Sequence, residues 1–162
     1  MATTLNDPEL YERDFHLWTQ RQAAELRRAA EAGSNLPLDW LHLAEEIESL
    51  GERDRREFYS RLVRVIEHLL KLQFCPSAEP RRSWRISVLN QRGDLARLLK
   101  SSPSLRRFAE SYVREAYEEA SGIVERAIPD PELGLWPDLP RICPYPLDQL
   151  LDLDFWPEPD HP

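Results

Sequence analysis

Proline placement is the feature that most limits what this chain can fold into. Nine of its 14 prolines stand at or beyond position 129, and the other five occupy positions 8, 37, 76, 80 and 103. Proline lacks a backbone N–H and clashes with the preceding helical turn, so it is tolerated at the start of a helix and avoided inside one. The long windows between the first five prolines are therefore open to helix formation.

Apolar residues recur at the helical spacing of about 3.6 residues in four windows of the chain. These windows lie at about 8–33, 37–72, 81–99 and 103–127. Helices of similar length joined by short connections favour antiparallel neighbours. The two-residue alternation of a strand is not found. The sequence therefore predicts an all-α fold, an up-and-down helical bundle of four to five helices.

The second window contains a glycine that we interpret as a break. Gly51 is followed by the wholly polar stretch from Glu52 to Glu57, after which the apolar stripe resumes at Phe58. An uninterrupted helix over 37–72 would be about 55 Å long. Because such a length exceeds what a compact bundle of this size needs, we predict a break or kink near Gly51.

The proline-rich end is predicted to wrap around the bundle as an extended segment with one short helix, Leu147–Leu151. It carries large apolar residues that a free linker would not need, namely Leu133, Leu135, Trp136, Ile142, Leu150, Phe155 and Trp156. We therefore predict a single domain over 1–162, with the bundle at about 8–128 and the tail at 129–162.

Charge is distributed unevenly along the chain, whose net formal charge is −8. Residues 51–114 contain 15 Lys/Arg and 7 Asp/Glu, whereas 1–50 contain 4 and 10 and 115–162 contain 2 and 12. A basic middle between two acidic ends predicts neutralisation inside the molecule. The net negative charge also makes nucleic acid an unlikely partner, because phosphate binding relies on local positive potential.

The absence of long apolar runs favours a soluble protein without a membrane partner. No stretch of 18 apolar residues is present, and the first ten residues lack the basic and apolar regions of a secretory leader. The expected location is the cytoplasm. Cys75 and Cys143 have no metal-site spacing, and both are expected to be free thiols.

Metal, cofactor and catalytic motifs are not found. His42, Glu45 and Glu46 share a helix face, but the paired Glu-x-x-His arrangement of carboxylate-bridged bundles is missing. His68 and Cys75 would be separated by about 10 Å along a helix, too far for a thiolate–imidazole pair. We expect no metal, no cofactor and no catalytic residues, and we favour a protein that is not an enzyme.

Several polar residues stand where a simple bundle would not place them. Arg81, Arg82 and Arg85 surround Trp84 at the start of the third helix, where the helix dipole disfavours cations. They either pair with the chain's own acidic residues or grip a ligand phosphate or base. His68 and Gln91 lie on or beside apolar stripes and are expected to make hydrogen bonds inside the core.

Eight short strings occur in the order found in a known bacterial family. They are LAEEIESLG at 43–51, SRL at 60–62, HLLK at 68–71, SWR at 83–85, QR at 91–92, PSL at 103–105, CPY at 143–145 and DFWPE at 154–158. On these strings the chain resembles the bacterial "domain of unknown function 29" family from Tyr11 to Glu158. The resemblance implies an all-helical bacterial cytoplasmic protein and implies no activity. Trp156 departs from the family, which more often has an aliphatic residue there.

Three functional hypotheses remain open on the sequence alone. The leading one is a non-enzymatic helical interaction or regulatory module that binds a protein, either another chain or itself. The alternative is an enzyme or a small-molecule or metal binder whose pocket between helices is formed by Glu46, Glu48, His68, Arg85, Gln91 and Arg92. The third is nucleic-acid binding through the basic middle, beginning with Arg81, Arg82, Trp84 and Arg85.

Overall fold

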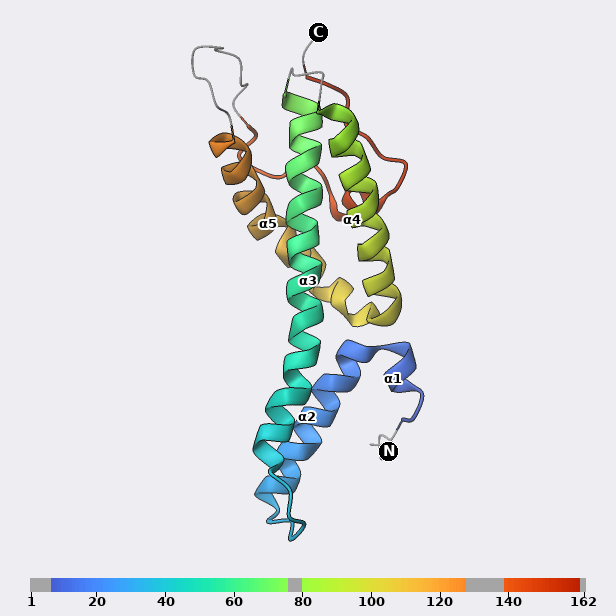
Figure 1. The fold of residues 1–162 in the computed structure, drawn as a ribbon, viewed down its shortest axis with the longest axis vertical. Coiled ribbons are helices and arrows are strands. Elements are labelled where there is room, and N and C mark those ends of the chain that lie inside the picture. The colour runs from blue at the N-terminus through green and yellow to red at the C-terminus, as the bar shows by residue number, and fades with distance from the viewer. Residues whose placement is uncertain (1–6, 76–79, 128–138, 161–162) are drawn as a thin grey trace. The chain divides into compact units, whose positions relative to one another are not determined.

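The computed structural model describes residues 7–75, 80–127 and 139–160. Their regular elements are all helical, which confirms the predicted all-α bundle (Figure 1). In chain order these are α1 Leu10–Arg13, α2 Phe15–Glu31, α3 Trp40–Phe74, α4 Arg81–Ser101, the 3₁₀ turn η1 Pro103–Leu105, α5 Arg106–Arg126 and α6 Leu147–Leu151. None of these helices is both long and apolar enough to cross a membrane.

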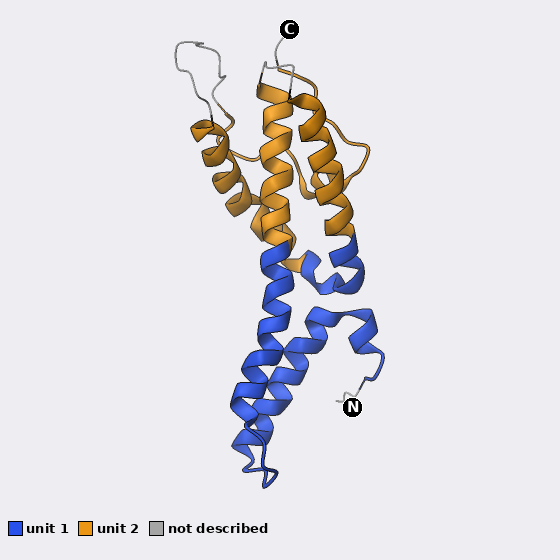
Figure 2. Ribbon diagram, viewed as in Figure 1, with its two compact units in different colours: residues 1–57, 97–106 blue, residues 58–96, 107–162 orange. Residues whose placement is uncertain are grey.

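The chain divides into two compact units (Figure 2). The first unit comprises residues 1–57 and 97–106, and the second comprises 58–96 and 107–162. Helix α3 therefore begins in the first unit and ends in the second, and the last turn of α4 belongs to the first unit.

The first unit is built on α2 and the beginning of α3, which run side by side in opposite directions (Figure 1). Asp14 starts α2 by accepting a hydrogen bond from the backbone N–H of Leu17, as an N-cap residue does. The same carboxylate accepts hydrogen bonds from the backbone N–H and the hydroxyl of Ser104. One acidic side chain thus starts α2 and fixes η1 against it.

The predicted break at Gly51 is wrong, because α3 continues without interruption from Trp40 to Phe74. A Cβ atom added to Gly51 would lie 2.2 Å from Oγ1 of Thr19 and 3.1 Å from Nδ1 of His16. Glycine is therefore required here by the close approach of α2 to α3, and it does not end the helix. The polar stretch after it remains helical, and within it Asp54 accepts a hydrogen bond from the buried Ser102.

The second unit has a core formed by the later part of α3, α4, α5 and α6. Its fully buried apolar side chains are Leu62, Val65, Ile66, Leu69, Leu70, Val88, Leu95, Ala109, Ala116, Ala120, Val124 and Leu150. Three of those on α5 are alanines, which allow close packing of this helix against its neighbours. The apolar stripes identified in the sequence are therefore the faces that form this core.

The described part of the C-terminal tail lies against the helices of the second unit. Tyr145 is buried and donates a hydrogen bond to the side chain of Gln73, and Leu150 of α6 is fully buried. The short helix has the predicted bounds. Ile142 was predicted as an anchor, but it is 80% exposed, because this position lies in a bend outside α6. The predicted anchors Leu133, Leu135 and Trp136 lie outside the described residues.

Candidate functional site

Arg92 holds the tail to α4 in the second unit. Its side chain is only 1% exposed. Its guanidinium donates hydrogen bonds to the carbonyl oxygens of Gln149 at 2.8 Å, Leu150 at 2.9 Å and Phe155 at 2.9 Å. Two of these carbonyls end α6, where a helix lacks internal donors and carries partial negative charge. Burial lowers the pKa of Arg92 to about 10, so the side chain remains charged at neutral pH.

The contacts of Arg81 explain why an arginine is tolerated at the start of α4. It donates hydrogen bonds to the carbonyl oxygens of Leu72 at 2.7 Å and Cys75 at 3.2 Å. Both carbonyls belong to the C-terminal end of α3, which carries partial negative charge. The dipole of α4 disfavours a cation at its start, but the C-terminal end of α3 stabilises the charge of Arg81.

The remaining members of this cluster have different surroundings. The guanidinium of Arg85 lies 4.3 Å from the ring centroid of Trp156, a cation–π contact. Trp84 is half-buried, and Nζ of Lys71 lies 6.0 Å from its ring centroid. Arg82 is exposed, as is Arg85. Within the cluster, Arg82 and Arg85 are therefore the arginines that face solvent.

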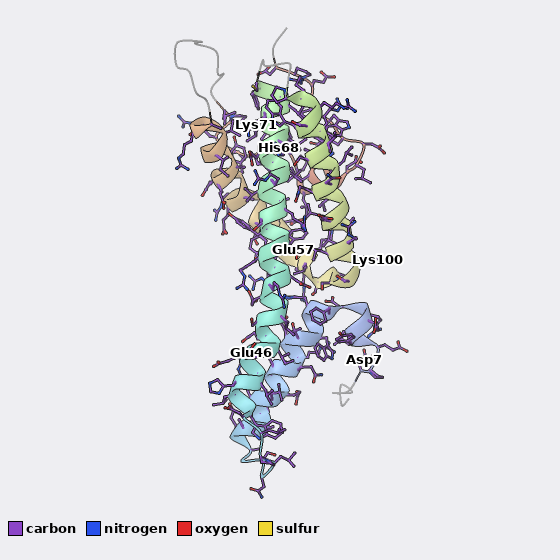
Figure 3. The ribbon with its side chains drawn as sticks, in the orientation of Figure 1. Asp7, Glu46, Glu57, His68, Lys71 and Lys100 are labelled. Atoms are coloured by element: carbon purple, nitrogen blue, oxygen red, sulfur yellow. The ribbon has the colours of Figure 1, made fainter. Side chains whose placement is uncertain are left out.

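His68 and Lys71 lie near the C-terminal end of α3 (Figure 3), and Glu67 precedes His68 in the same helix. Glu67 is buried, and its two carboxylate oxygens contact Lys71 at 2.7 Å and Arg64 at 2.8 Å. Burial lowers the pKa of His68, and the charge of Glu67 opposes this shift. Nδ1 of His68 is buried with no hydrogen-bond partner among the described residues. The core hydrogen bond predicted for His68 is therefore not made by this nitrogen.

Gln91 has the structural role expected of a partly buried amide. Its Oε1 atom accepts a hydrogen bond of 3.1 Å from Arg61, which also forms an ion pair with Asp94. These contacts join α3 to α4 within the second unit.

The two glutamates of the predicted pocket belong to the first unit. Glu48 forms an ion pair with Arg27, and Glu46 is exposed. His68, Arg85, Gln91 and Arg92 belong to the second unit. Within that unit, hydrogen bonds to the described residues engage Oε1 of Gln91 and all three guanidinium nitrogens of Arg92.

Sequence reasoning missed a buried polar network in the first unit. His16, Thr19 and Ser102 are all buried. The backbone N–H of His16 donates to the hydroxyl of Ser102 at 3.2 Å, and that hydroxyl donates to Asp54 at 3.4 Å. Burial raises the pKa of Asp54. Because the serine is bonded to the backbone of the histidine and is fully buried, this network stabilises packing and does not present a nucleophile.

Exposed leucines lie just before α3 and in its first turn. We define the leucine surface as Leu36, Leu38 and Leu41, which are 61%, 50% and 58% exposed. Leu41 lies in the first turn of α3, Leu36 and Leu38 lie in the segment just before the helix, and the backbone N–H of Leu38 bonds to the carbonyl of Leu36. Asp39 caps the helix and contacts His42 at 2.6 Å, which raises the pKa of His42. Exposed large apolar side chains that lie within a few residues of one another are found at interaction sites.

A cavity of about 370 Å³ opens beside the tail of the second unit. It is lined by Gln73, Pro144, Tyr145, Gln149, Phe155, Trp156, Pro157 and Glu158. Its volume falls in the range of small-molecule sites. No group of three His, Cys, Asp or Glu side chains within residues 7–75, 80–127 and 139–160 is arranged to hold a metal ion.

The fold and these contacts define a class, an all-α helical protein whose conspicuous charged residues hold its own helices and tail in place. Residues 10–156 match the family described as "Domain of unknown function DUF29", and the chain belongs to this family. The chain is similar to an α-helical protein of unknown function from Rhodospirillum rubrum ATCC 11170, with 30% identity and a TM-score of 0.69 over 90% of each chain. Among curated proteins, none matches the chain.

Proposed function

We propose that this protein is a non-enzymatic interaction module that binds a partner protein through the leucine surface of its first unit. The observation that carries the proposal is the exposure of Leu36, Leu38 and Leu41 together. Burying a leucine completely contributes about 1.5–3 kcal/mol, so covering three half-exposed leucines contributes about 3 kcal/mol. That contribution corresponds to a change of about a hundredfold in the dissociation constant.

The surroundings of the leucine surface specify the chemistry of the partner. Between Arg28 and Arg53 the chain contains six acidic residues and no lysine or arginine. Glu45 and Glu46 are exposed one turn beyond Leu41. Opposite charges at the rim of an apolar contact favour one partner over others and speed association. The partner is therefore a protein with an apolar helix face flanked by arginine or lysine.

A photo-crosslinking amino acid at position 41 tests this proposal in the native host. We expect one protein to be crosslinked and identified, and the purified protein to bind this chain. The double substitution Leu38→Ser and Leu41→Ser should then weaken binding about thirtyfold, whereas Ile142→Ser, at another exposed apolar position, should leave it unchanged. A crosslinker at position 41 that captures no protein, this chain included, would refute the proposal.

The cavity beside the tail supports a second candidate function, the binding of a small ligand. Tyr145 and Phe155 provide aromatic walls and Glu158 provides a carboxylate, whereas the ring of Trp156 is already faced by the guanidinium groups of Arg85 and Arg92. This combination suits a ligand with a cationic group. Titration with tetramethylammonium, followed by tryptophan fluorescence, would show saturable binding that Glu158→Gln weakens. A response equal in wild type and variant would exclude this candidate.

A further inference from the structure

We infer that the partner of the leucine surface is a second copy of this chain, which presents the exposed face of its α4. This inference rests on the proposed function, because it names the occupant of the same surface. The face consists of Arg82, Arg85, Ile86 and Leu89, all exposed. We call it the arginine face.

Helical geometry brings the members of the arginine face together. Ile86 and Leu89 are three residues apart on α4, so their side chains are neighbours. Arg82 precedes Ile86 by four residues, and Arg85 precedes Leu89 by four. Each apolar side chain therefore has an arginine one turn away on the same side of the helix.

The charges of the two surfaces are complementary. Residues 80–93 contain four arginines and no acidic residue, whereas residues 29–52 contain six acidic residues and no lysine or arginine. Arg81 and Arg92 are held by backbone carbonyls, whereas Arg82 and Arg85 are exposed, Arg85 with its guanidinium also on the ring of Trp156. Glu45 and Glu46 are the exposed acids next to the leucine surface. A contact between the two surfaces thus covers leucines with Ile86 and Leu89 and places glutamates against arginines.

The complementarity also determines which surfaces of the two copies can meet. Two leucine surfaces facing each other would bring acidic residues together, and two arginine faces would bring arginines together, both of which are unfavourable. The contact is therefore between unlike surfaces of two copies. Such a contact forms either twice in a twofold dimer, where each copy covers the leucine surface of the other, or once per pair of copies, where copies add head to tail into a ring or an open chain.

Complementation between two variants tests this arrangement by sedimentation velocity at low salt. The leucine-surface variant carries Leu38→Ser and Leu41→Ser, and the arginine-face variant carries Ile86→Ser and Leu89→Ser. We expect the wild type to form a dimer or larger species as concentration rises, and each variant alone to be monomeric. An equimolar mixture should form a heterodimer and nothing larger, because a single competent contact remains.

Further measurements separate this inference from the proposed function. Association of the wild type should weaken at least about fivefold between about 0.05 and 0.3 M salt, since exposed charges are screened. A crosslinker at position 41 should attach to the α4 peptide of a second copy, a result that does not depend on the serine variants folding. A wild type that stays monomeric at several hundred micromolar, or a mixture without heterodimer, would overturn the self-association. In that case crosslinking of position 41 to a different protein would leave the proposed function standing, and no crosslinking at all would refute both.

Discussion

Replacement of Gly51 by alanine tests the close contact between α2 and α3 in the first unit. In most helix interiors this substitution stabilises, because alanine favours the helix over glycine by about 1 kcal/mol. Here the added Cβ would lie 2.2 Å from Oγ1 of Thr19, a distance at which atoms must move apart. Thr19 is fully buried, and its hydroxyl bonds to the carbonyl of His16 at 2.7 Å, so it has little freedom to move.

The expected cost follows from these two opposing effects. Overpacking a well-packed core typically costs about 1–3 kcal/mol, and a stiff β-branched neighbour places this site near the upper end. Subtracting the helix preference leaves a net destabilisation of about 2 kcal/mol. For a chain of this size that corresponds to a fall in Tm of about 4–8 °C.

Thermal and urea unfolding of the variants measure the effect and its cause. Gly122→Ala on α5 is the matched control, because the nearest atom to its added Cβ is the flexible end of Arg126 at 3.7 Å. Gly122→Ala should stabilise the protein by up to about 1 kcal/mol, whereas Gly51→Ala should destabilise it. Thr19→Ala should be less harmful in the Gly51→Ala background than in the wild type, giving a coupling of about 1–2 kcal/mol. Stabilisation by Gly51→Ala, or a coupling of zero, would refute the close contact.

Two further predictions concern the second unit, and a third concerns the first. Arg92→Ala should lower the free energy of unfolding by about 3–5 kcal/mol, because one buried and two partly buried carbonyls lose their charged donor. Arg82→Ala should change it by less than about 0.5 kcal/mol, and equal effects of the two variants in urea unfolding would contradict the role of Arg92. The pKa of His68 is lowered in the folded state, so the unfolded state binds more protons and stability should fall as pH drops below about 6.5. His68→Gln should flatten this loss between about pH 7 and 5. Asp39 raises the pKa of His42, so this pair stabilises the folded state at low pH and the stabilisation is lost as pH rises. His42→Gln should therefore lower stability more at low pH than at high pH.

The fold could be predicted from the sequence because its determinants are local. The spacing of Leu62, Val65, Ile66 and Leu69 identifies a helix face without knowledge of its neighbours, and these residues are all buried. Proline at position 103 correctly marked the start of a helical turn. The prediction at Gly51 was wrong because the sequence does not distinguish a glycine that ends a helix from a glycine that close packing requires. Only the position of Thr19 on the other helix distinguishes them.

The polar contacts could not be predicted because their partners are distant in sequence or are not side chains. The network of His16, Asp54 and Ser102 joins residues up to 86 positions apart, and no periodicity connects them. The sequence suggested Arg92 for a ligand pocket, yet its partners are backbone carbonyls of Gln149, Leu150 and Phe155. Every residue has a backbone carbonyl oxygen, so the sequence does not indicate which carbonyls accept a hydrogen bond from an arginine.

Those carbonyl contacts change how the charge pattern should be interpreted. Charge counting predicted that arginines of the basic middle would face the acidic ends, but the ion pairs Arg61–Asp94 and Arg64–Glu67 lie within the middle segment. Arg81 and Arg92 bind the C-terminal carbonyls of α3 and α6, which carry about half a negative charge that no count of side chains includes. These four arginines are therefore compensated without Glu45 or Glu46. The exposed glutamates beside the leucine surface and the exposed arginines of α4 can then face a second molecule, which is the condition that the proposed contact between copies requires.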